Sequence, residues 1–81
     1  MANRPKKRSL NVAGHSTSVS LEDDFWDALN EMARARGHSV PNIVAEIDSA
    51  RGSRGLSSAI RSAVLAFYQS QARANNKQDK Q

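Results

Sequence analysis

The sequence predicts a mainly helical, single-domain protein in which one N-terminal strand precedes three helices. Three observations support this class. Apolar residues alternate with serine over residues 15–21, the apolar spacing changes to that of a helix from Phe25 onward, and no second strand of equal strength follows. A lone strand leaves its backbone donors and acceptors without partners. We therefore expect the same strand of a second copy to complete an antiparallel ribbon across a homodimer.

The predicted strand has one apolar face and one small polar face. The apolar positions are Thr17, Val19 and Leu21, and the polar positions are Ser16, Ser18 and Ser20. A two-stranded ribbon with a polar face fits the major groove of DNA. Residues 9–13 show a weaker alternation of the opposite phase, and Gly14 lies where the phase changes. We interpret Gly14 as a bulge or sharp bend, and residues 9–13 as an outlying extension or a short extra strand.

The three helices are expected at residues 22–36, residues 39–51 and residues 56–71. Acidic residues begin the first helix, where the helix dipole favours them, and Gly37 is a natural stop. Trp26 lies beside the apolar stripe of this helix and could line either its edge or a dimer contact. Ser39 is a good N-cap for the second helix, and serines also open the third.

The positive charge of the chain is concentrated at its N-terminus. The net charge is +4, and residues 1–21 contain Arg4, Lys6, Lys7 and Arg8 without any acidic residue. Residues 22–81 contain eight basic and eight acidic residues. We expect residues 1–8 to be a disordered basic arm that contacts DNA phosphates, with a solvated, solubilising tail as the alternative. Residues 9–71 would form the domain, and residues 72–81 a flexible tail.

Composition and size argue against several classes of protein. The chain has 81 residues and no cysteine, which excludes disulfides, thiolate metal sites and cysteine nucleophiles. The longest apolar run, residues 63–68, is too short to cross a bilayer, so we expect a cytoplasmic protein. Neither His15 nor His38 has a catalytic partner at a recognisable spacing, and the acidic residues of the first helix do not converge on a metal. We expect no enzymatic activity and no cofactor.

The order of strand, helix, tight turn and helix resembles the ribbon-helix-helix (Arc/MetJ-like) superfamily. Residues 17–25, Thr-Ser-Val-Ser-Leu-Glu-Asp-Asp-Phe, resemble its entry from strand to helix, and residues 37–40, Gly-His-Ser-Val, resemble its turn between helices. The longer pattern over residues 14–61 resembles a bacterial subfamily of small single-domain proteins. The resemblance covers roughly residues 9–70.

This resemblance implies a dimeric DNA-binding transcriptional regulator, a repressor in type, whose paired strands enter the major groove. The residues that would face the bases are Ser16, Ser18, Ser20 and His15. Those that would contact phosphates are Arg4, Lys6, Lys7 and Arg8, with Ser39 and Val40 at the start of the second helix. The dimer core would consist of Val19, Leu21, Phe25, Leu29, Ile43 and Ile47.

Two features depart from the usual pattern of the superfamily. Serine makes single hydrogen bonds, so an all-serine ribbon would discriminate weakly between bases. DNA recognition would then depend more on His15, Asn11 and the basic arm. The third helix extends the minimal fold, and in a rival alignment this helix, with its Ser-Ser-Ala-Ile-Arg opening, replaces residues 39–51 as the second helix of the motif. The alternative function is an antitoxin or protein-interaction module that uses the C-terminal helix. A dimer of this fold that has lost DNA binding is a third reading.

Overall fold

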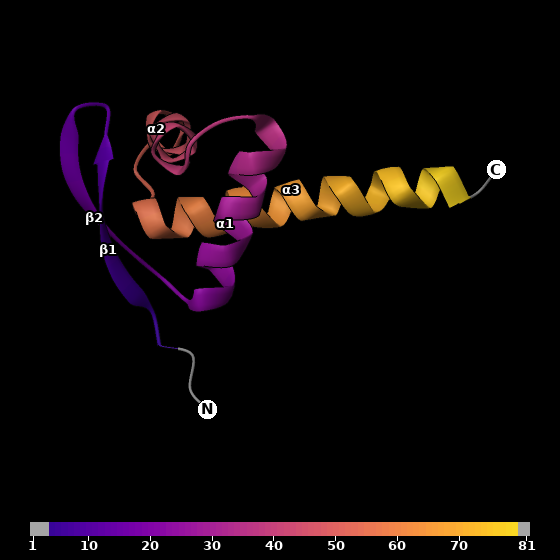
Figure 1. Cartoon of the computed structure of the whole chain (residues 1–81), viewed down its shortest axis with the longest axis horizontal. Helices are drawn as coiled ribbons and strands as arrows, with labels where there is room; N and C mark the ends of the chain where they lie inside the picture. The colour runs from indigo at the N-terminus through magenta and orange to yellow at the C-terminus, as the bar shows by residue number, and fades with distance from the viewer. Residues whose placement is uncertain (1–3, 80–81) are drawn as a thin grey trace.

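The computed structural model describes residues 4–79, which form a two-stranded antiparallel sheet and three helices (Figure 1). The elements in chain order are β1 (Lys6–Val12), β2 (His15–Leu21), α1 (Asp23–Arg36), α2 (Val40–Ala50) and α3 (Leu56–Asp79). The hairpin lies on one side of the helices, and α3 begins close to it and runs away from it towards the C-terminus. The predicted class, a ribbon followed by two helices and an additional C-terminal helix, is confirmed. No helix in this part of the chain is long and apolar enough to span a membrane.

The partner of the predicted strand lies in the same chain, which corrects the expectation of a lone strand. β1 pairs with β2 so that Val12 lies opposite His15 and Lys6 opposite Leu21. Ala13 and Gly14 form the two-residue connection, and both have positive φ angles, 52° and 83°. This is the backbone of a type I′ hairpin turn.

The hairpin also explains the change of phase at Gly14. In a hairpin closed by two residues, even positions of one strand lie opposite odd positions of the other. Leu10 and Val12 therefore share a face with Thr17 and Val19, although their phases differ along the sequence. The phase change, interpreted above as a bulge or sharp bend, is therefore caused by the two-residue turn.

Trp26 on α1 anchors the start of β1. Its indole Nε1 donates a hydrogen bond to the carbonyl oxygen of Lys6 at 3.0 Å, and its side chain is buried. The guanidinium of Arg8 lies 4.9 Å from the centre of the indole ring, within the range of a cation–π contact. Residues 6–8 therefore belong to the sheet rather than to a disordered arm, and residues 1–3 of the expected arm lie outside the described residues.

The ends of α1 and α2 form as expected from their capping residues. Gly37 has φ 70°, and the amides of Gly37 and His38 donate to the carbonyls of Arg34 and Ala33, which is the Schellman pattern. Ser39 caps α2, because its hydroxyl accepts a hydrogen bond from the amide of Asn42 at 3.2 Å. These local signals fix the tight turn between the two helices.

α3 is longer than predicted. It was expected to end near Gln71, but the helix continues to Asp79. Its sequence contains no glycine or proline that would stop it, and alanine and glutamine are good helix formers. The expected tail over residues 72–81 is thus helical as far as it is described, and residues 80–81 lie outside the described part of the chain.

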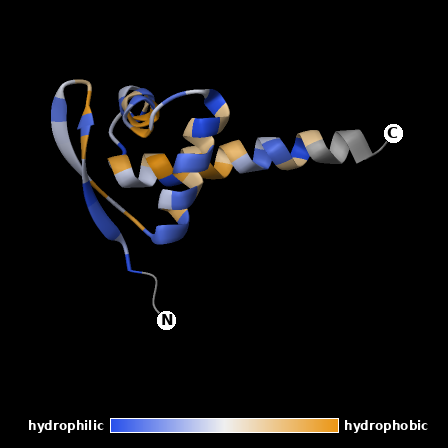
Figure 2. Cartoon of the chain, in the orientation of Figure 1, coloured by the Kyte–Doolittle hydropathy of each residue, from blue (hydrophilic) through white to orange (hydrophobic). Residues whose placement is uncertain are grey.

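The hydrophobic core is complete within one chain. It joins the inner face of the hairpin to all three helices, as Figure 2 shows by the hydrophobic residues gathered where the helices meet. Its largest fully buried side chains are Leu21, Leu29, Met32, Ile43, Ile60, Val19 and Val44. Among the residues expected in a dimer core, Phe25 and Ile47 are only partly buried, and the other four are buried by their own chain. Burial of these residues therefore does not require a second copy.

Replacing Leu21 by Ala should lower the free energy of unfolding by about 2–4 kcal/mol, since it removes a fully buried side chain beneath the ribbon. Urea unfolding followed by circular dichroism measures the change. Leu65→Ala is the matched control, because Leu65 is 57% exposed and the same change should cost less than about 0.5 kcal/mol. Equal losses in the two variants would contradict this core.

Candidate nucleic-acid interface

The hairpin has one face against the helices and one face directed outward. Arg8, Leu10 and Val12 of β1 share the inner face with Leu21, Val19 and Thr17 of β2. Lys7, Ser9 and Asn11 share the outer face with Ser20, Ser18 and Ser16. Of these outer residues, Ser20 is half-buried and the others are exposed. The expected separation of apolar and serine positions in β2 is therefore present in the structure.

The outer face carries only hydrogen-bonding groups and positive charge. The three serines offer hydroxyl groups, Asn11 offers an amide, and Lys7 offers an ammonium group. No carboxylate lies on this face. Sequence reasoning placed Lys7 in the arm and did not identify Ser9, because it did not recognise β1 as the partner strand. The Ala13–Gly14 pair, flanked by two alternating segments, was the signal that could have revealed them.

His15 does not share the outer face with the serines, which corrects its place among the base-facing residues. It lies opposite Val12, and alternation along β2 puts it on the side of Thr17 and Val19. His15 is exposed because it lies at the end of the hairpin, next to the turn. There it borders a cavity together with Asp48 and Arg51 from the C-terminal end of α2.

The basic residues of the N-terminal segment have different roles in the structure. Lys6 makes an ion pair with Asp23, with 3.2 Å between Nζ and Oδ1, and Arg8 stacks on Trp26. For Arg4 and Lys7 the structure records no ion pair within residues 4–79, and both are exposed. Arg8 is also exposed and has no recorded ion pair within residues 4–79, so Arg4, Lys7 and Arg8 are the residues of this group whose charge no carboxylate of the described chain pairs.

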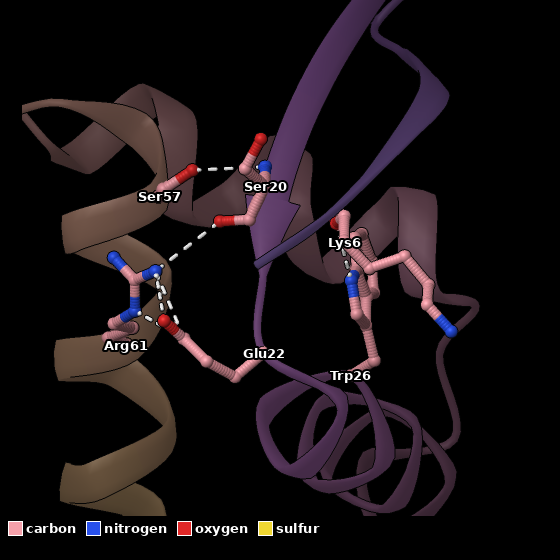
Figure 3. Close-up of polar contacts among 6 residues, drawn as sticks. All are labelled: Lys6, Ser20, Glu22, Trp26, Ser57 and Arg61. Atoms are coloured by element: carbon pink, nitrogen blue, oxygen red, sulfur yellow. Dashed lines mark hydrogen bonds and ion pairs between the residues drawn. The ribbon is translucent and has the colours of Figure 1, made fainter. Parts of the chain in front are cut away.

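α3 closes one end of the ribbon, as the close-up in Figure 3 shows. The hydroxyl of Ser57 accepts a hydrogen bond from the amide of Ser20 at 3.3 Å. Arg61 donates to both carboxylate oxygens of Glu22, at 3.0 and 3.2 Å, and its Nη2 lies 3.5 Å from the carbonyl oxygen of Ser20. Neither Ser57 nor Arg61 was expected near the ribbon, because only the folded chain brings residues so distant in sequence together.

The helix start that contacts β2 is therefore that of α3. The first turn of α2, which contains Ser39 and Val40, has no recorded hydrogen bond to the hairpin among the described residues. Val40 instead packs against the core. A phosphate contact by Ser39 and Val40 remains a prediction. α2 packs against β1 and α3 packs against β2, so both helices contact the hairpin. Which of them is the second helix of the motif stays a prediction.

Glu22 lies between the end of β2 and the start of α1, and its carboxylate binds Arg61 of α3. The two hydrogen bonds from Arg61 lower the pKa of the Glu22 carboxyl below its usual value, and a backbone hydrogen bond adds to this effect. Because the pKa is lower in the folded chain, ionised Glu22 stabilises the fold above the pKa of the unfolded chain. This stabilisation is lost as the pH falls through the folded value.

Glu22→Gln should therefore be less stable than the wild type at pH 7 and should approach it as the pH falls below the usual glutamate pKa of about 4.3. Arg61→Gln should behave in the same way, and the double variant should lose less than the sum of the two single changes. Urea midpoints at pH 7 and at pH 3 measure the effect. A stability difference that does not change with pH would contradict the pairing of these residues.

A second feature is an apolar groove that adjoins the buried stripe of α3. Leu65 is the exposed large hydrophobic residue of the described chain, and it borders a groove of about 300 Å³ with Phe25, Val64 and Tyr68. Tyr68 donates a hydrogen bond to Glu31 of α1, which holds the two helices together at the end of this groove. The groove is mainly apolar, although its lining also includes Arg61 and Ser62.

The comparison with protein families identifies the class. Residues 5–68 match the model of the ribbon-helix-helix domain, so the chain belongs to this family. The match begins just before β1 and ends within α3, and it therefore includes both strands, α1, α2 and the first part of α3. Neither a curated protein nor a solved structure matches the chain significantly. Membership supports a DNA-binding regulator in general, and proteins of this family are typically not enzymes.

Proposed function

We propose that the protein is a dimeric transcriptional regulator, a repressor in type, that inserts a β-ribbon into the major groove of DNA. The observation that carries this proposal is the outer face of the hairpin. It presents hydroxyl, amide and ammonium groups without a carboxylate, and all of its residues except the half-buried Ser20 are exposed. Such a surface suits the acceptor-rich edges of bases and the negative backbone of DNA.

The width of a paired ribbon indicates that its central strands and its outer strands contact different parts of the DNA. If β2 pairs with β2 of a second copy, the two β1 strands lie outside them. Adjacent strands are about 4.8 Å apart, so the outermost strands of four would be roughly 14 Å apart. The major groove is only about 12 Å wide. The central strands with Ser16 and Ser18 would then enter the groove, and β1 with Lys7 would lie over the phosphates of its walls.

The chemistry of the ribbon also bears on its specificity. Each serine exchanges a single hydrogen bond with a base edge, which discriminates bases less than a bidentate pair. Asn11 is the residue of this face whose amide can pair with adenine in a bidentate manner. We therefore infer that base preference depends on Asn11 at least as much as on the serines, and that the serines allow close approach of the backbone.

Replacing Ser18 by Glu should abolish DNA binding, because a dimer would then carry two carboxylates in the centre of the ribbon, facing base acceptors and phosphates. Ser18→Ala should weaken specific binding by less than the roughly 1–3 kcal/mol of a bidentate contact. Fluorescence anisotropy with the DNA upstream of its own gene, compared with random DNA, measures both.

Asn30→Glu is the matched control for the Ser18 variants. Asn30 is exposed on α1, and its amide donates to the carbonyl of Trp26 within the same helix. This change adds the same charge away from the ribbon and should leave affinity nearly unchanged. If Ser18→Glu and Asn30→Glu bind DNA equally well, the ribbon is not the surface that binds DNA.

Lys7→Gln should flatten the dependence of log K on log salt concentration by roughly 2, since a dimer loses two phosphate contacts of about 0.9 each. Arg73→Gln is the control, because Arg73 is in the second half of α3 (Leu56–Asp79) and this helix runs away from the hairpin (Figure 1). Deletion of residues 1–8 would not test this point, because it removes residues 6–8 of β1. An unchanged slope in Lys7→Gln would exclude Lys7 from the phosphate contacts.

The alternative function is a protein-interaction module, of the antitoxin kind, and the groove around Leu65 is the feature that favours it. A partner bound there would leave the ribbon face open, so both functions are compatible in one protein. Leu65→Asp should then abolish binding of the partner and leave DNA affinity unchanged. Loss of DNA affinity in this variant would instead tie the groove to the assembly that binds DNA.

A further inference from the structure

The two edges of the hairpin differ in how they discourage contact with other strands. β1 carries Lys6, Lys7 and Arg8, and charged residues, lysine above all, keep a free edge from pairing. β2 carries only small neutral residues from Ser16 to Ser18, with neither proline nor charge. Residues 9–11 of β1, which lie opposite residues 16–18 of β2, are uncharged as well, so charge protects the edge of β1 at its start and protects no part of the edge of β2. An edge without such protection is the property of a strand that pairs in the assembled protein.

The backbone groups on that edge are identified by the contact with α3. The amide of Ser20 points away from β1, because it donates to Ser57. Alternate residues of an antiparallel strand direct their backbone groups to the same edge, so Ser16 and Ser18 point the same way as Ser20. Within residues 4–79 the structure records no hydrogen bond to the backbone of Ser16 or Ser18 on this edge.

The turn end of the hairpin borders a cavity of about 320 Å³. It is lined by residues 12, 13 and 15–18 of the hairpin and by Asp48, Arg51 and Leu56. The hydrogen bonds of Ser57 and Arg61 to Ser20 close the strand edge at the end nearer α1. The open part of the edge is thus limited to Ser16 and Ser18, between α3 and the hairpin turn.

These limits select among the ways in which two copies of β2 can pair about a twofold axis. With Ser18 opposite the partner's Ser18, Ser20 would lie opposite the partner's Ser16, and its bonds to α3 would have to break. With Ser16 opposite the partner's Ser16, Ser18 would lie opposite the partner's Gly14, which has φ 83° and belongs to the turn. With Ser16 opposite the partner's Ser18, only the open groups are used.

We propose that β2 pairs with β2 of a second copy in this last register, with Thr17 on the twofold axis and α3 acting as the stop that sets the register. The inference rests on the dimer of the proposed function and specifies its geometry. Thr17 directs its backbone groups towards β1, so the two Thr17 residues form a non-hydrogen-bonded pair, whose Cα atoms are about 4.5 Å apart. That separation is within the range that a disulfide bridges.

Cysteine cross-linking tests the register, because the chain has no cysteine of its own. Thr17→Cys should form a disulfide-linked dimer under mild oxidation, at least about tenfold faster than Ser16→Cys or Ser18→Cys, whose sulfurs would be diagonal neighbours in this register. Non-reducing electrophoresis follows the rate, and circular dichroism verifies that each variant is folded. Sedimentation of the reduced proteins, without DNA, reports the dimer independently.

The outcomes test the register of the strands and the existence of the dimer separately. Fastest linking of Ser18→Cys or Ser16→Cys would overturn the register and leave the dimeric ribbon intact. A dimer in sedimentation that none of the three variants links would overturn pairing through β2. A monomer in sedimentation would overturn the dimer of the proposed function as well.

The role of α3 as a stop has its own test in the double variant Ser57→Ala/Arg61→Gln. This change removes the groups that bind Ser20, so the register with Ser18 opposite the partner's Ser18 becomes available. Linking through Ser18→Cys should then rise relative to linking through Thr17→Cys in the same background. An unchanged ratio would show that α3 does not set the register.

Discussion

The pairing of β1 with β2 across the Ala13–Gly14 turn is the constraint on which the rest of the structure depends. It gives β2 a partner within its own chain and so allows Val19 and Leu21 to be fully buried without a second copy. It also brings Lys6 and Arg8 to Trp26, which connects the start of the chain to α1. A short domain has little core, and the hairpin increases the share of its apolar surface that one chain can bury.

The same pairing divides the basic residues of the N-terminus between structure and surface. Lys6 and Arg8 are on the inner face and contact Asp23 and Trp26, whereas Lys7 is on the outer face with the serines. Exposed ion pairs contribute little to stability, so the indole of Trp26 is the stronger anchor. The positive charge near the ribbon is therefore placed by the alternation of a strand rather than spread along a flexible arm.

α3 connects the ribbon to the rest of the helical layer. Its first turn contacts the last residues of β2 through Ser57 and Arg61, and Arg61 also reaches Glu22 at the start of α1. These contacts give the ribbon a fixed end. The family match, which extends into α3, agrees with α3 being part of the domain rather than an appendage.

The sequence by itself determined the local features of this protein. The serine and apolar alternation of β2, the left-handed Gly37, the Ser39 cap and the helical periods all depend on neighbouring residues, and all three helices follow from them. Tertiary structure decided which segments meet. The weak alternation of β1 forms a strand because β2 pairs with it and the indole of Trp26 binds its first residue. Contacts such as Ser57 with Ser20 leave no periodic trace in a sequence, since they join residues from elements that are far apart along the chain.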